Sequence, residues 1–73
     1  MKKVLITDDC HPFLMEGLGE MGYFCDFLPE IPPQETFRLI PEYHGLIINS
    51  KILVNQDFID NAQQLEFVGR LGS

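Results

Sequence analysis

Short apolar runs alternate along the chain with longer stretches in which apolar residues recur at helical spacing. The short runs predict β-strands and the spaced stretches predict helices with one apolar face. We expect strands at 3–7, 23–28 and 45–48, and a fourth strand that starts at 65–68. Helices are expected to open at 11–12 and stop before Gly22, to span 34–40, and to run from 56 to about 63. The run at 45–48 has no polar position, which is typical of a strand covered on both faces.

Each expected helix has a boundary signal. Pro12 suits the first turn of its helix, and Gly22 suits the position after its end. Pro41 is expected to close the second helix, and the side chain of Asn55 can cap the start of the third. Phe13, Leu14, Leu18 and Met21 are expected to form one apolar face of the first helix, and Phe37 and Ile40 are expected to face inward in the second. The third helix carries the apolar residues Phe58, Ile59 and Ala62.

This order of elements predicts an α/β fold. A helix between each pair of successive strands implies a parallel sheet of about four strands, with right-handed crossovers and helices on both faces. No segment able to cover the last strand follows it within the 73 residues. We therefore expect a truncated domain, or a chain that forms a homodimer or higher oligomer through an exposed sheet edge.

Charge and composition exclude several classes of function. The net charge is −6 and the 5 basic residues are scattered, so nucleic acid would be repelled. The apolar runs are far shorter than the ~20 residues that cross a bilayer, and no signal peptide is visible, so a cytoplasmic location without membrane contact is expected. Cys10 and Cys25 form no C-x-x-C pair and indicate reduced thiols, and no metal site is expected.

Gly17 to Gly22 spells G-x-G-x-x-G, the pattern of a dinucleotide-binding turn. A working fingerprint follows a strand and opens a helix, because the helix N-terminus must face the pyrophosphate. Here the motif follows an expected helix and precedes an expected strand. We interpret it as a glycine-rich helix end and assign no cofactor site to this chain.

A second candidate pattern is Asp8-Asp9, which follows the first strand. Paired carboxylates at that place could bind magnesium in a response-regulator receiver-like module. Such a module also needs an Asp after its third strand, where this chain has Asn49-Ser50, and Asn cannot accept a phosphoryl group. His11 and His44 stand apart from any triad-like arrangement, so no catalytic residue is expected. A receiver-like module and a homodimerising interaction module are the alternative functions.

Polar turns follow the third and fourth expected strands. If these strands are neighbours, both turns lie at one edge of the sheet. Backbone N–H groups and a guanidinium there would favour a small anion such as a carboxylate. The competing interpretation is that Arg70 pairs with a surface acid. The candidate substrate-binding residues are Asn49, Ser50, Lys51, Arg70, Gly72 and Ser73.

The order and spacing of four segments resemble a known family. The segments are Lys3-Val4-Leu5-Ile6-Thr7-Asp8, Gly45 through Ser50, Asn55 through Ala62, and Leu65 through Ser73. Over its full length the chain resembles the first lobe of D-isomer-specific 2-hydroxyacid dehydrogenases, most closely the phosphoglycerate dehydrogenase branch.

The resemblance implies that residues 1–73 are the N-terminal portion of a flavodoxin-like substrate-binding domain, with the nucleotide-binding domain absent. It implies an NAD-dependent parent enzyme acting on a small 2-hydroxy or 2-oxo acid. The backbone of the two polar turns would hold the substrate carboxylate, with Arg70 as a charge at the cleft, and the chain alone would be inactive. Asn49 and Ile52 stand where the branch often has Arg and Thr, which leaves substrates other than 3-phosphoglycerate open.

Overall fold

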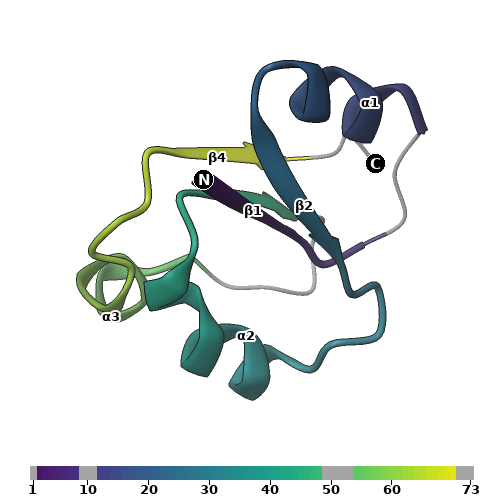
Figure 1. Ribbon diagram of the computed structural model, residues 1–73. Coiled ribbons are helices and arrows are strands. Elements are labelled where there is room, and N and C mark those ends of the chain that lie inside the picture. Colours follow the sequence, from purple (N-terminus) through teal and green to yellow (C-terminus); the bar gives the residue numbers. More distant parts are fainter. Residues whose placement is uncertain (1, 9–11, 49–53, 71–73) are drawn as a thin grey trace.

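A computed structural model describes residues 2–8, 12–48 and 54–70 of the chain. Four strands form one parallel sheet in the order β2-β1-β3-β4, so the predicted α/β fold is confirmed (Figure 1). The strands are β1 (Lys2–Ile6), β2 (Tyr23–Phe27), β3 (Gly45–Ile48) and β4 (Phe67–Arg70). The helices are α1 (Pro12–Glu20), α2 (Pro33–Leu39), the 3-10 turn η1 (Ile40–Glu42) and α3 (Gln56–Asn61).

Helices cover both faces of the sheet. Figure 1 shows α1 on one side and α2 with α3 on the other. The alternation along β1 sends Val4 and Ile6 toward α1 and Leu5 toward α2 and α3, where each is fully buried. Burial of each such side chain stabilises the fold by about 1.5–3 kcal/mol. β3 is buried at all four positions, as its apolar run predicts.

The inward face of α1 differs from the expected one. Leu14 and Leu18 pack against the sheet as predicted, together with Met15. Phe13 and Met21 are 73% and 72% exposed, so their assignment to the inward face is wrong. Phe13 lies on the other side of the first turn from Met15, and Met21 lies beyond the last helical residue.

The two other helices each turn a narrow face toward the core. In α2 and η1 the buried side chains are Thr36 and Ile40, four residues apart, whereas Phe37 is 43% exposed. In α3 Phe58 is buried and Ile59, its neighbour, is 51% exposed. Residues one position apart lie about 100° apart around a helix. The expected inward position of Phe37 is therefore wrong, although its ring still contacts that of Phe58 at 6.2 Å between centroids.

Some element boundaries also differ from those expected. Pro41 lies inside η1 instead of closing α2, because the chain tightens into a 3-10 turn and continues through it. α3 stops at Asn61, two residues early, and β4 begins at Phe67 where the register with Gly45 starts. By contrast, the two capping signals are confirmed. Gly22 has φ of +93°, and the side chain of Asn55 accepts a hydrogen bond from the Phe58 N–H at 3.0 Å.

Gly45 is required by a close approach between β3 and β4. It pairs in register with Phe67, and a Cβ at this position would overlap the Phe67 ring. That ring packs edge-on against Tyr23 at 5.6 Å between centroids. The absence of a side chain at the start of β3 therefore lets an aromatic pair cover the strand.

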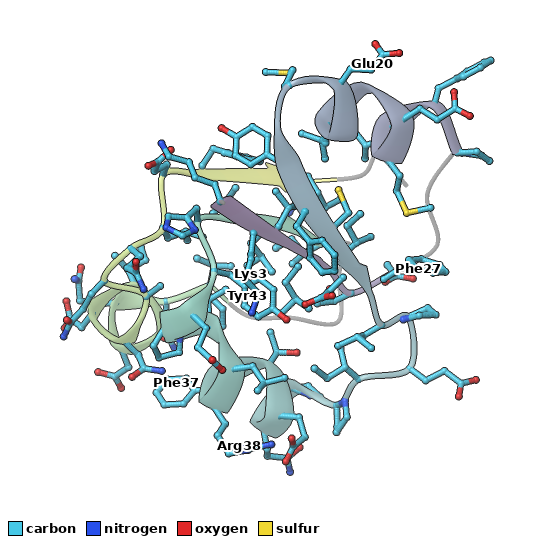
Figure 2. The ribbon with its side chains drawn as sticks, in the orientation of Figure 1. Lys3, Glu20, Phe27, Phe37, Arg38 and Tyr43 are labelled. Atoms are coloured by element: carbon cyan, nitrogen blue, oxygen red, sulfur yellow. The ribbon has the colours of Figure 1, made fainter. Side chains whose placement is uncertain are left out.

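Tyr43 ties three parts of the fold together under the sheet. Its hydroxyl donates to Oδ2 of Asp26 in β2 at 2.5 Å, and the Lys3 ammonium lies 4.7 Å from its ring centroid (Figure 2). Burial of the ring, and then the hydrogen bond to Asp26, raise the pKa of the Tyr43 phenol. The side chain therefore joins β1 and β2 to the end of η1.

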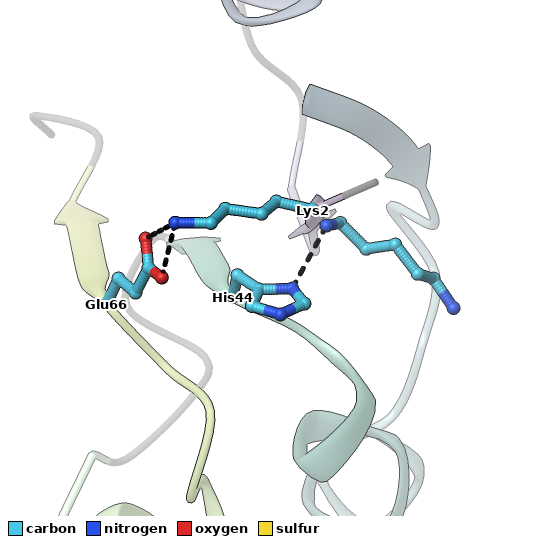
Figure 3. Close-up of polar contacts among 4 residues, drawn as sticks. Lys2, His44 and Glu66 are labelled. Carbon is cyan, nitrogen blue, oxygen red and sulfur yellow. Dashed lines mark hydrogen bonds and ion pairs between the residues drawn. The ribbon is translucent and has the colours of Figure 1, made fainter. Parts of the chain in front are cut away.

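His44 connects the amino-terminal ends of the strands (Figure 3). Its Nδ1 accepts a hydrogen bond from the Lys3 N–H at 3.2 Å, and its backbone N–H donates to the Lys3 carbonyl at 2.8 Å. Its carbonyl accepts from the Glu66 N–H, and the Glu66 carboxylate binds the Lys2 ammonium at 2.6 Å. That contact with the carboxylate raises the pKa of Lys2. His44 thus has a structural role at the edge opposite the strand exits.

Candidate functional site

The site is built where the strands end. β3 and β4 are parallel neighbours, and Ile48 pairs in register with Arg70 at their last described positions. The sequence prediction that these two strand exits lie side by side is therefore confirmed. On the other flank of β3, Ile6 of β1 pairs with Ile47, so three carboxyl ends share one edge.

The order in which strands are added to the sheet reverses beside β1. From β1 the chain passes to β2 on one side, and β3 then lies on the opposite side of β1. Helices consequently leave the neighbouring exits of β1 and β3 toward opposite faces of the sheet. In open α/β sheets ligands bind in the crevice formed at such a switch point. The switch point lies between β1 and β3, and Arg70 at the end of β4 is one strand away from it.

Arg70 is the predicted site residue that the structure describes. It is the last residue of β4 and its side chain is exposed. Among the described basic side chains, Lys2 and Arg38 each bind a glutamate and Lys3 lies over Tyr43. Arg70 forms no hydrogen bond or ion pair with any described residue. The chain has 11 acidic residues, but none of the described ones binds this guanidinium.

Thr7 contributes to this edge in a way that sequence reasoning missed. It follows β1 and is fully buried, and its N–H and hydroxyl both donate to the Ile47 carbonyl, at 3.0 and 3.3 Å. These two hydrogen bonds to one oxygen fix the end of β1 against β3 near the strand exits. Asp8 follows it at a half-buried position. The sequence shows a hydroxyl at the end of an apolar run, but only the strand order shows that the hydroxyl meets the Ile47 carbonyl.

The comparisons with known proteins assign this architecture to a family. A sequence profile described as "D-isomer specific 2-hydroxyacid dehydrogenase, catalytic domain" matches residues 4–73. The chain belongs to this family.

Relatives of the chain are named D-3-phosphoglycerate dehydrogenase. The chain is 32% identical to the protein from Sus scrofa and 30% identical to the one from Homo sapiens, over 73 residues in each case. It is 29% identical over 72 residues to the protein from Methanocaldococcus jannaschii. These alignments cover 99–100% of this chain and 14% of each relative. The chain thus spans about one seventh of the length of these dehydrogenases.

The fold is also found in a solved structure. The crystal structure of the PH0520 protein from Pyrococcus horikoshii OT3 matches with a TM-score of 0.82. The match covers 96% of this chain and 21% of that protein, at 16% identity. At this identity the likeness supports the fold alone.

The glycine motif lies where its sequence context places it. Gly17 and Gly19 are in the second half of α1, and Gly22 makes the turn before β2. These residues end a helix and open none, so they lack the geometry of a dinucleotide turn. In this dehydrogenase family member the motif is a helix end, as the order of the surrounding elements predicts.

Other site predictions fall partly outside the described residues. Five predicted substrate-binding residues lie outside the described residues, so their role stays a prediction: Asn49, Ser50, Lys51, Gly72 and Ser73. Asp9 of the candidate magnesium pair also lies outside them. Within the described ranges, no three His, Cys, Asp or Glu side chains gather in a group that could hold a metal ion. Nor is any described helix long and apolar enough to cross a membrane.

Proposed function

We propose that this chain forms the substrate-carboxylate side of the cleft in an NAD-dependent D-2-hydroxyacid dehydrogenase of the phosphoglycerate dehydrogenase type. Family membership and the names of its relatives support the reaction class. The observation that carries the site is Arg70, an exposed guanidinium without a described partner at the shared exits of β3 and β4.

The chemistry of this edge suits the binding of a carboxylate. A guanidinium offers two parallel N–H donors to one carboxylate, which fixes both the position and the plane of the substrate. Charge-assisted hydrogen bonds of this kind contribute about 1.5–3 kcal/mol each. The proposed role of Arg70 is to hold the carboxylate of a 2-hydroxy or 2-oxo acid. The substrate carbon C2, which carries the hydroxyl or oxo group, would then face the other parts of the parent enzyme.

NAD belongs to the proposed parent reaction as the hydride carrier. The glycine motif of this chain does not fit this cofactor, because it ends a helix instead of opening one. We therefore propose that cofactor binding and proton transfer use other parts of the parent enzyme. This chain binds and orients the substrate and is inactive alone.

The proposal is tested by titrating the ¹⁵N-labelled chain with pyruvate, a small 2-oxo acid, and with acetone as the neutral control. Pyruvate is expected to shift the amide signals of Ile48 and Arg70, and acetone is not. Arg70→Ala should weaken pyruvate binding about tenfold, the equivalent of ~1.4 kcal/mol, whereas the matched Arg38→Ala should not. Equal effects of the two variants, or shifts confined to the amino-terminal ends of the strands, would exclude this site.

A further inference from the structure

A second concave surface lies away from the strand exits of β3 and β4. A hollow of about 500 Å³ opens between the end of β2 and helix α2. Its lining is mostly apolar and includes Phe27, Leu28, Ile31 and Leu39. Two carboxylates, those of Glu30 and Glu35, also line it. We call this hollow the β2 groove. Its volume falls within the ~300–1,000 Å³ typical of ligand sites.

The β2 groove continues an open strand edge. In the sheet order, β2 pairs with β1 alone, so its outer backbone groups face away from the described sheet. Phe24, Phe27 and Leu28 are 51%, 40% and 39% exposed along this strand and its exit. Figure 2 shows Phe27 projecting from the end of β2. Exposed apolar side chains beside an unpaired strand edge are features of a surface that binds an extended segment.

The charge of the β2 groove selects the kind of segment. The Arg38 guanidinium binds the Glu35 carboxylate and lowers its pKa, so this acid is already neutralised. Glu30 is exposed and forms no hydrogen bond or ion pair with any described residue. The rim therefore carries the negative charge of Glu30 without a described partner, in a chain whose net charge is −6. A cationic side chain next to an apolar one complements this surface.

We propose that the β2 groove docks an extended segment of a partner protein that alternates apolar and basic residues. Such a segment would add a strand to the free edge of β2. Its apolar side chains would enter the hollow beside Leu28, and a lysine or arginine would meet Glu30. A second copy of this chain fits less well, because it would bring its own Glu30 and its own net negative charge to the contact.

The test is an NMR titration of the ¹⁵N-labelled protein with the peptide acetyl-Lys-Leu-Lys-Leu-Lys-Leu-amide. The same peptide with Glu in place of Lys is the charge control. The lysine peptide should shift the amides of 24–31 and bind at least tenfold more tightly than the glutamate peptide. Leu28→Asp should weaken binding at least tenfold, whereas Ile59→Asp, the same charge change at an exposed apolar residue of α3, should not. Glu30→Gln should weaken it severalfold, whereas the matched Glu20→Gln on α1 should not.

Several results would overturn the proposal. Equal binding of the two peptides would remove the charge argument, and equal losses in the variants and their controls would indicate non-specific attraction to an acidic protein. Shifts at 24–31 that grow with protein concentration in the absence of peptide would identify a second copy as the occupant. Shifts that map to the strand exits of β3 and β4 would assign the peptide to the substrate edge.

Discussion

Tyr43 shows how one side chain couples the stability of this domain to pH. Burial and the hydrogen bond to Asp26 both favour the neutral phenol, so its pKa is raised in the folded state. The stability from this proton is complete below the ordinary pKa of 10. It is lost as pH rises, because the unfolded chain ionises first.

Tyr43→Phe is expected to lower the free energy of unfolding at pH 7 by about 1 kcal/mol, because half-buried Asp26 loses its donor. The variant should also lose less stability between pH 9 and 11 than the parent sequence does, by roughly the share of one tyrosine. Urea denaturation across this range measures both effects. Tyr23→Phe is the control at pH 7, since that hydroxyl has no hydrogen bond to a described residue. An alkaline decline unchanged by Tyr43→Phe would contradict the role given to this phenol.

At the scale of elements, α3 depends on the residue that caps it. The helix has six residues, too few to be stable alone, and the Asn55 side chain satisfies one of its free N–H groups. Asn55→Ala should destabilise the fold by about 1 kcal/mol, while Asn55→Asp, which keeps the oxygen acceptor, should cost less. Thermal unfolding of the three proteins compares them. Equal losses in Ala and Asp would show that packing, not capping, sets the start of α3.

The elements also show which parts of the fold the sequence pattern can predict. The third strand is predicted well because β3 is apolar at every position. The helix boundaries at Gly22 and Asn55 are predicted well because a glycine suits positive φ and an asparagine side chain suits a helix cap. Inward helix faces are predicted less well. In α2, Phe37 lies one position from the buried Thr36, and hydrophobicity favours the wrong neighbour. The Thr36 hydroxyl can be buried because it donates to the Pro32 carbonyl at 3.2 Å, a bond that composition does not reveal.

At the scale of the molecule, the described sheet has two open edges, β2 and β4. We expect self-association through β4, where Val68 is 44% exposed and the nearby acid Glu66 is paired with Lys2. Sedimentation velocity of the isolated chain should show a dimer or higher oligomer at high concentration. Val68→Lys should shift it toward the monomer, and Ile59→Lys, at a similarly exposed residue of α3, should not. A monomer at every concentration would exclude association through this edge.

The sequence predicts the position of the candidate site better than it predicts the contacts within it. Parallel strands end on the same side of a sheet, so the sequence predicts Arg70 beside the exit of β3 if these strands are neighbours, and their register shows that they are. The lack of a described partner for Arg70 is not predictable in this way, because it depends on where the 11 acids lie in space. The bond of Thr7 to Ile47 escapes the sequence for the same reason: strand order, unlike composition, sets which carbonyl a hydroxyl meets.

The most direct test of the account is the steady-state rate of NADH oxidation by the proposed parent enzyme, measured with a panel of 2-oxo acids. We expect activity with at least one of these acids, and none when the 73-residue chain is assayed alone. Arg70→Ala should raise KM at least tenfold, about 1.4 kcal/mol of lost substrate binding, whereas Arg38→Ala should leave KM unchanged. NADH oxidation by the isolated chain, or the same KM in Arg70→Ala as in the parent sequence, would contradict the proposed role in substrate binding.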